Sequence, residues 1–239
     1  MRPDLAAAHD LAWQRLAGPG TWLSGAERVA IAAETRHAAA CPFCAARAAA
    51  ALPLSVPGQH ASLGRLGAAE IEAVHRIRTD SGRLGSAWFR RVNADLPAPR
   101  YIELVSVVVV TLAVDTFRAA AGLPRRELPD PLPGDPSRHL PAGARPGPGW
   151  TAALRPEDVS AAEPDLFRDY PGPRERRGAN IHLALSLVPD SMIHWWDAFE
   201  PMYLTGPQMH DFDREFRAIT HPQIEMLAAR VAALNQCEY

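Results

Sequence analysis

Two cysteines with a proline between them are the residues of this sequence that most clearly carry chemistry. The stretch "RHAAACPFCAARAAA" contains Cys41 and Cys44 with two residues between them. Pro42 suits the first turn of a helix and disfavours the α conformation at the residue before it, so we expect Cys41 to be a helix N-cap. The free N–H groups of that turn and the helix dipole favour a thiolate at Cys41. Cys44, one turn later, is placed to resolve an oxidised Cys41.

Two further polar residues precede the cysteines at helical spacing. Glu34 and His37 stand seven and four residues before Cys41, and either is a candidate to move the proton of a thiol. Each also has a structural interpretation, an ion pair for Glu34 and a solvated helix histidine for His37. Together with Cys41 and Cys44 they would supply four metal ligands, although a helix break at Pro42 turns the cysteines away from them. The sequence therefore favours redox chemistry over a metal site or a packed, inert thiol pair, and it requires no cofactor.

Two other residues receive a structural interpretation first. His75 stands in "AVHRIRTDSGRLGSAW", where a core or interface histidine is favoured over one that faces the thiols. Glu103 precedes an apolar run, where a buried acid needs a partner. We expect it to cap a helix or to pair with an arginine.

The composition excludes several classes of function. The 239 residues carry a net charge of −2, which predicts neither a nucleic-acid partner nor a membrane-binding surface. All 25 basic residues are arginine, which excludes Schiff-base lysine chemistry and a P-loop lysine. The chain begins without the apolar stretch of a signal peptide, and the run from Leu104 to Val114 is too short to span a bilayer. With only three cysteines, we expect the reducing cytoplasm.

The pattern of helix formers and prolines divides the chain into three parts. Residues 1–122 read as a series of helices, among them one entered by N-cap Ser24 and one over "PRYIELVSVVVVTLAVDTFRAAAGLP" that ends at Gly122. Residues 123–178 are rich in proline and predict a linker or a strap over the surface. Residues 179–239 predict two short helices broken at Pro189 and a last, interior helix. The expected fold class is all-α.

A helix near the end of the sequence repeats the pattern around Cys41. Aligned on Cys41 and Cys237, "LSGAERVAIAAETRHAAACPF" and "ITHPQIEMLAARVAALNQCEY" share a hydroxyl N-cap, an apolar helix and Cys-x-aromatic. We interpret this as an internal repeat, with chance similarity of two alanine-rich helices as the alternative. The second stretch resembles the signature of the alkylhydroperoxidase D and carboxymuconolactone decarboxylase-like family. In that family a glutamate stands twelve residues before a Cys-x-x-Cys, and a histidine follows four residues after it.

The resemblance implies an alkylhydroperoxidase D-like helical bundle of two family-like halves joined by the proline-rich strap. It also implies a homo-oligomer, because such units bury apolar faces against one another. Glu225 stands twelve residues before Cys237, as the family pattern requires. In the first copy the positions of the family's glutamate and histidine are Val29 and Ala48, so the family's proton relay is missing there.

The expected function is a thiol-based peroxidase or disulfide oxidoreductase with an antioxidant role. Cys41 attacks a peroxide or a substrate disulfide, Cys44 closes the disulfide, and a thiol reductant recycles it. The candidate site residues are Cys41, Cys44, His37, Glu34, Glu225 and Cys237. Two alternatives remain: a non-redox enzyme of the carboxymuconolactone decarboxylase-like type acting on a small molecule, and a non-enzymatic sensing or assembly protein whose thiol pair reports oxidation.

The second copy has its Glu225 and Cys237, but the rest of its motif would fall after Tyr239. One interpretation is an interrupted copy that continues in the native frame, through a UGA codon for selenocysteine. The other is the natural end of a degenerate copy.

Overall fold

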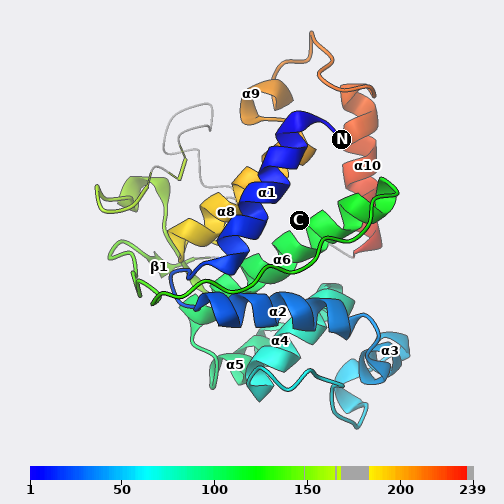
Figure 1. The fold of residues 1–239 in the computed structure, drawn as a ribbon, viewed down its shortest axis with the longest axis vertical. Coiled ribbons are helices and arrows are strands. Elements are labelled where there is room, and N and C mark those ends of the chain that lie inside the picture. The colour runs from blue at the N-terminus through cyan, green and yellow to red at the C-terminus, as the bar shows by residue number, and fades with distance from the viewer. Residues whose placement is uncertain (148, 165, 168–182, 236–239) are drawn as a thin grey trace.

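The computed structural model describes residues 1–147, 149–164, 166–167 and 183–235, and this part of the chain is mostly helical (Figure 1). It contains nine α-helices and a single antiparallel pair of two-residue strands. The helices are α1 Pro3–Ala17, α2 Gly25–Ala38, α3 Pro42–Ala49, α4 Ala68–Asp80, α5 Ser86–Asn93, α6 Ala98–Ala120, α8 Pro189–Phe199, α9 Gly206–Met209 and α10 His221–Leu234. The strands are β1 Arg145–Pro146 and β2 Ala152–Ala153. The expected helical class is confirmed, with this small sheet as an addition.

Helix α6 forms the centre of the molecule and packs against α2, α4 and α8. Its β-branched valines also suit a strand, but the buried positions recur at helical spacing, and Leu104, Val108 and Val114 are fully buried on one face. The predicted helix is confirmed. It ends at Ala120, two residues before Gly122, whose φ of 67° belongs to the left-handed region that glycine adopts readily.

Helix α2 begins as the sequence predicts. Ser24 is its N-cap, and the Ser24 hydroxyl and the Glu27 carboxylate form a capping box that satisfies the first free N–H groups. Helix α10 has the same length of 14 residues and begins after the other predicted hydroxyl N-cap, Thr220.

From Leu123 to Leu140 the proline-rich segment is extended, whereas the later described residues of the predicted strap contain β1 and β2. No helix or strand is present between Leu123 and Leu140. Its backbone is tied to α1 and to the turn that follows: the Leu132 N–H donates to the Ala17 carbonyl, the indole N–H of Trp13 donates to the Glu127 carbonyl, and the Arg138 N–H donates to the Thr21 carbonyl. Helix α8 then packs against α1 and α6, so the last part of the chain rests on the first (Figure 1).

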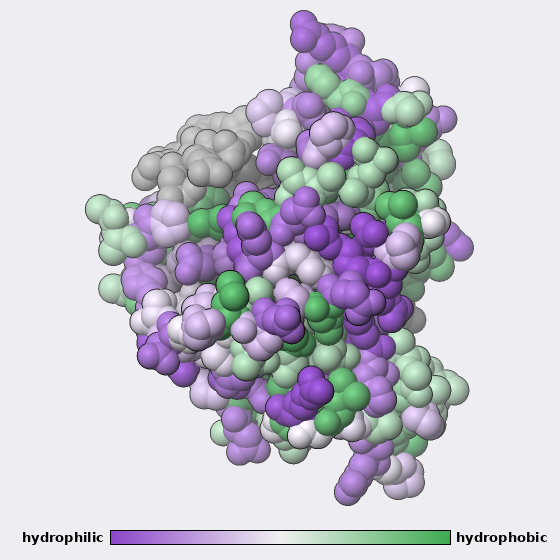
Figure 2. Space-filling view, in the orientation of Figure 1, coloured by the Kyte–Doolittle hydropathy of each residue, from purple (hydrophilic) through white to green (hydrophobic). Residues whose placement is uncertain are grey.

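The expectation that the last helix is interior is wrong. Met226, Leu227, Val231 and Leu234 of α10 are all more than half exposed, and His221 is its single buried residue. Hydrophobic residues are accordingly visible over this helix at the upper right of Figure 2. The apolar residues of α10 form a face, but no other described element covers it. Residues 179–182 of the helix predicted before Pro189 lie outside the described part, and in the described part Leu183 is followed by turns and not by a helix.

A buried ion pair fastens α6 to α2. The Glu103 carboxylate accepts from the Arg28 guanidinium at 3.0 Å and from the Trp22 N–H, and both charged side chains are almost fully buried. The predicted arginine partner of Glu103 is thus confirmed. None of the described helices is both long and apolar enough to cross a membrane.

Candidate dithiol and dihistidine site

The local backbone places both thiols as the sequence predicts. Cys41 is the N-cap of α3, with φ −72° and ψ 117°, and Pro42 is the first helical residue. Cys44 follows one turn later on the inner face of this short helix. Both cysteines are free and buried, with exposed fractions of 2% and 3%.

Helix α4 brings His75 to the second thiol. Its Nδ1 lies 3.2 Å from the Cys44 Sγ, and its Nε2 lies 2.8 Å from the Glu34 Oε1 on α2. Neither His75 nor Glu34 is exposed at all. The other Glu34 oxygen accepts from the Leu63 N–H at 3.0 Å, so the carboxylate is held from both sides. Because a carboxylate only accepts, the pair places the proton of His75 on Nε2 and leaves the Nδ1 lone pair toward the sulfur.

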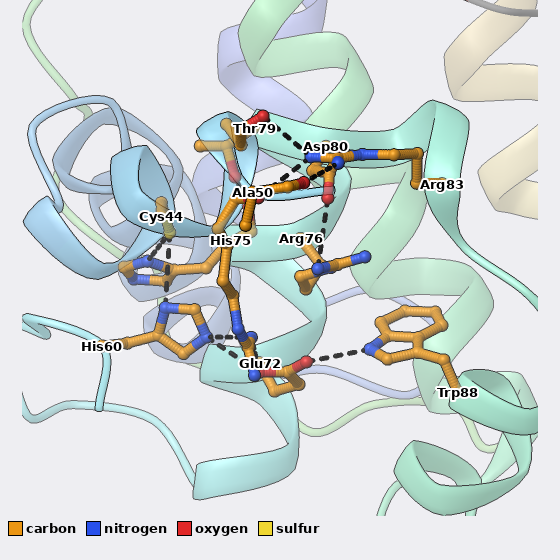
Figure 3. A network of polar contacts seen from close by, with 12 residues as sticks. Cys44, Ala50, His60, Glu72, His75, Arg76, Thr79, Asp80, Arg83 and Trp88 are labelled. Atoms are coloured by element: carbon orange, nitrogen blue, oxygen red, sulfur yellow. Dashed lines mark hydrogen bonds and ion pairs between the residues drawn. The ribbon is translucent and has the colours of Figure 1, made fainter. Parts of the chain in front are cut away.

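The loop between α3 and α4 brings a second histidine. His60 Nδ1 lies 3.3 Å from the Cys44 Sγ and 3.9 Å from the Cys41 Sγ. Its Nε2 lies 2.8 Å from the Glu72 Oε2 (Figure 3). Phe43 packs edge-on against the imidazole, with the ring centroids 5.0 Å apart. Each imidazole therefore has one nitrogen on sulfur and the other on a carboxylate.

The carboxylate behind His60 is anchored in turn. The Arg47 guanidinium donates to Glu72 Oε2 at 2.8 Å. The Trp88 indole N–H donates to Glu72 Oε1 at 3.0 Å (Figure 3). Burial opposes ionisation of Glu72, but its bonds to His60, Arg47 and Trp88 outweigh burial and lower its pKa to about 2.

The cluster also shifts the titration of its thiol and imidazoles. Burial alone would raise the pKa of Cys41, yet the Cys44 N–H and His60 lower it to about 7. Burial would lower the pKa of His60, but its bonds to Cys44 and Glu72 raise it to about 10. Burial prevails at His75, whose pKa is lowered despite the Glu34 carboxylate.

The structure joins some of the residues predicted for the site and separates others. Cys41, Cys44 and Glu34 come together, and Glu34 is connected to the thiols through its contact with His75. His37 lies in the last turn of α2, and among the described residues it contacts neither sulfur. The four possible metal ligands are therefore Cys41, Cys44, His60 and His75, and not the set with Glu34 and His37 that the spacing suggested.

The candidate residues of the second copy do not join this cluster. Glu225 lies on α10, separated from α3 along the long axis of the molecule (Figure 1), and accepts from the Tyr203 hydroxyl at 2.6 Å. Cys237 lies outside the described residues.

Sequence reasoning missed His60, Glu72, Arg47 and Trp88. His60 stands sixteen residues after Cys44, in a loop without periodicity, and gives no signal by spacing. His75 gave a weak signal, because it follows the apolar Val74 in an amphipathic helix, and both residues are buried.

The four donor atoms of Cys41, Cys44, His60 and His75 lie within 4.8 Å of one another. Such a cluster has the groups for dithiol oxidation with proton transfer, and it also has the soft sulfur and imidazole donors of a transition-metal site. Comparison with family models, curated proteins and solved structures finds no match for this chain.

Proposed function

We propose that the chain is a thiol-based peroxidase, in which Cys41 is the nucleophile and Cys44 is the resolving thiol. The observation that carries the proposal is the line of contacts from Glu34 through His75 to the Cys44 Sγ. A side chain is commonly activated by a neighbouring base that a third group orients. Here Cys44 is the thiol, His75 is the base and Glu34 is the group that orients it.

The reaction needs two steps. The Cys41 thiolate, favoured at the N-terminus of α3, attacks one oxygen of a peroxide. The O–O bond breaks, Cys41 becomes a sulfenic acid, and the alkoxide leaves as the alcohol after taking a proton. Cys44 then gives its proton to His75 and attacks the Cys41 sulfur. The S–O bond breaks, hydroxide leaves as water with that proton, and the disulfide forms.

The burial of the thiols selects among substrates. With 2% and 3% of Cys41 and Cys44 exposed, a small peroxide reaches sulfur more readily than a protein disulfide does. A disulfide substrate, the other half of the expected activity, requires the loop that carries His60 to move. An external dithiol or thioredoxin-like reductant then restores the thiols.

The proposal extends to the finer fold. The resemblance to the alkylhydroperoxidase D-like family implies two related halves and a homo-oligomer, and the equal lengths of α2 and α10 support the repeat. In the first half, Val29 and Ala48 stand where the family has its glutamate and histidine. Glu34 and His75 then form a relay of the same composition from other positions of the chain.

Peroxide consumption by metal-free protein with excess dithiothreitol tests the activity. We expect turnover in the native chain, its loss in Cys41→Ser and Cys44→Ser, and a strong reduction in His75→Gln. His37→Gln is the matched control and should keep native turnover. Retained activity in a variant that carries both Cys41→Ser and Cys44→Ser would show a non-redox enzyme. Disulfide formation without turnover in the native chain would show a sensor.

The assignment of the two thiols has a separate test. In Cys44→Ser, a sulfenic acid should accumulate on Cys41 and be trapped by dimedone after one equivalent of peroxide. Trapping on Cys44 in Cys41→Ser, with none on Cys41 in Cys44→Ser, would reverse their roles.

A further inference from the structure

We infer that the reduced site binds one Zn²⁺ ion through Cys41 Sγ, Cys44 Sγ, His60 Nδ1 and His75 Nδ1. Three contacts between these atoms measure 3.2, 3.3 and 3.9 Å, and all four atoms lie within 4.8 Å of one another. Zinc–sulfur bonds of about 2.3 Å and zinc–nitrogen bonds of about 2.0–2.1 Å give tetrahedral edges of roughly 3.4–3.8 Å. The donors are therefore already close to the spacing of a Cys₂His₂ zinc site.

The groups behind the histidines match those that orient zinc ligands. His75 Nε2 lies against Glu34 and His60 Nε2 against Glu72, each at 2.8 Å. A proton held on Nε2 by a carboxylate leaves Nδ1 as the donor, and such carboxylate–histidine pairs are typical of zinc centres. Because both pairs have this arrangement, the two Nδ1 atoms converge on the sulfurs, and a zinc ion bound there would take the place of any proton on the Nδ1 of His60.

Both carboxylates are themselves fixed, so the imidazoles have little freedom to turn away. Leu63 N–H binds the second oxygen of Glu34, while Arg47 and Trp88 hold Glu72. A ligand set that is pre-positioned in this way loses little freedom when the metal binds.

The chemistry of the donors favours zinc over harder cations. Two thiolates and two neutral imidazoles neutralise one Zn²⁺ in a tetrahedral site, whereas Mg²⁺ and Ca²⁺ prefer oxygen donors. Four protein ligands leave no open position, and both cysteines and His75 are buried. The ion would therefore hold the site closed, as structural zinc does, and would not act as a Lewis acid on a substrate.

Zinc and the disulfide exclude each other because both use the same two sulfurs. The bound ion keeps the dithiol reduced, and oxidation expels it: two zinc-bound thiolates, one peroxide and two protons give the disulfide, free Zn²⁺, one alcohol and water. This last step rests on the proposed peroxidase chemistry, whereas the binding of zinc to the reduced chain does not.

Titration of the reduced, chelator-treated full chain with zinc chloride tests the inference. We expect one equivalent to bind, and the cobalt-substituted protein to show the visible bands of tetrahedral Co²⁺ with thiolate charge transfer. Cys44→Ser, His60→Gln and His75→Gln should each weaken binding at least about 10-fold, while His37→Gln should bind as the native chain does.

Circular dichroism identifies any variant that fails to fold. If a variant of the buried helical residues Cys44 or His75 fails, His60→Gln still tests the inference, because His60 lies on a loop. Absence of stoichiometric zinc, or native affinity in both His60→Gln and His75→Gln, would overturn the inference. Peroxide turnover of the metal-free chain is measured separately. Zinc binding without turnover removes only the proposed function, and turnover without zinc binding removes only the metal site.

Discussion

Glu34 and His75 form a hydrogen-bonded pair 2.8 Å apart, and neither side chain is exposed. The pair joins α2 to α4 in the core and at the same time aims the His75 Nδ1 at the Cys44 sulfur, 3.2 Å away. A single contact thus connects the packing of two helices to the chemistry of the thiols.

Replacement of Glu34 by Gln tests this connection. The amide keeps the size of the side chain but loses the charge that fixes the proton on His75 Nε2. The Nδ1 of His75 therefore becomes a weaker zinc ligand. We expect zinc affinity to fall roughly 10–100-fold and the charge-transfer band of the cobalt form to shift. Glu27→Gln on the same helix is the control, because Glu27 only caps the helix and pairs with Arg100. An unchanged affinity and cobalt spectrum in Glu34→Gln would contradict the role.

Oxidation of the metal-free chain should join Cys41 to Cys44 without unfolding it. The two sulfurs are less than 4.8 Å apart at the start of one short helix, so a disulfide requires only local movement. We expect the peptide map to show this bridge, and the far-ultraviolet circular dichroism to stay at its reduced value. A marked loss of helicity, or a bridge from Cys41 to Cys237, would exclude the local pair.

The parts of the fold that depend on local sequence were predictable. The start of α2 follows from the capping residue Ser24, and the helical course of α6 follows from its periodicity. The N-cap conformation of Cys41 follows from the steric effect of Pro42. Each of these involves residues within a few positions of one another, where one sequence carries enough information.

The site itself depends on contacts between distant residues. His60 reaches the thiols from an irregular loop, and His75 was favoured as a core histidine because one sequence does not show what a helix face meets. It is in fact both, since it is fully buried and also touches Cys44. The exposed apolar face of α10 is the opposite case, in which a helical pattern predicted burial that packing does not provide.

The stability of the protein should fall in acid through His194. Burial, and then the charges of Arg28 and Arg15, lower the pKa of His194 to about 3, against about 6.5 in an unfolded chain. Between these values the unfolded state takes up a proton that the folded state refuses, so stability is lost as the pH falls below about 6.5.

His194→Gln removes this proton uptake. We expect its free energy of unfolding to fall less than that of the native chain between pH 7 and pH 5, by on the order of 1 kcal/mol, in urea titrations. If the native and His194→Gln curves stay parallel over this range, His194 does not titrate as stated.

The buried pair of Arg28 and Glu103 should carry a large share of the packing of α2 on α6. Glu103→Gln leaves the Arg28 charge in the interior without its counter-charge, and breaking a buried pair in this way costs about 3–5 kcal/mol. Asp4→Asn, in an exposed pair with Arg2, should change stability by less than about 0.5 kcal/mol. Urea denaturation compares the two, and similar losses in both variants would contradict the difference in burial.

The conformation of the loop at Gly58 should decide where His60 lies. Gly58 has a φ of 143°, and a Cβ there would lie 2.8 Å from the Phe43 ring that packs on His60. Gly58→Ala therefore moves Phe43 and with it the imidazole, so we expect zinc affinity to fall at least about 10-fold.

Gly64→Ala provides a matched control in the same loop. Gly64 has a φ of 71°, so alanine is also strained there, but no atom lies within 4 Å of the added Cβ. Both variants should lose about 1 kcal/mol or more of stability through the backbone, and only Gly58→Ala should lose zinc affinity as well. Zinc titration and urea denaturation of the two variants separate these effects. Equal zinc affinities would mean that the contact between Phe43 and Gly58 does not position His60.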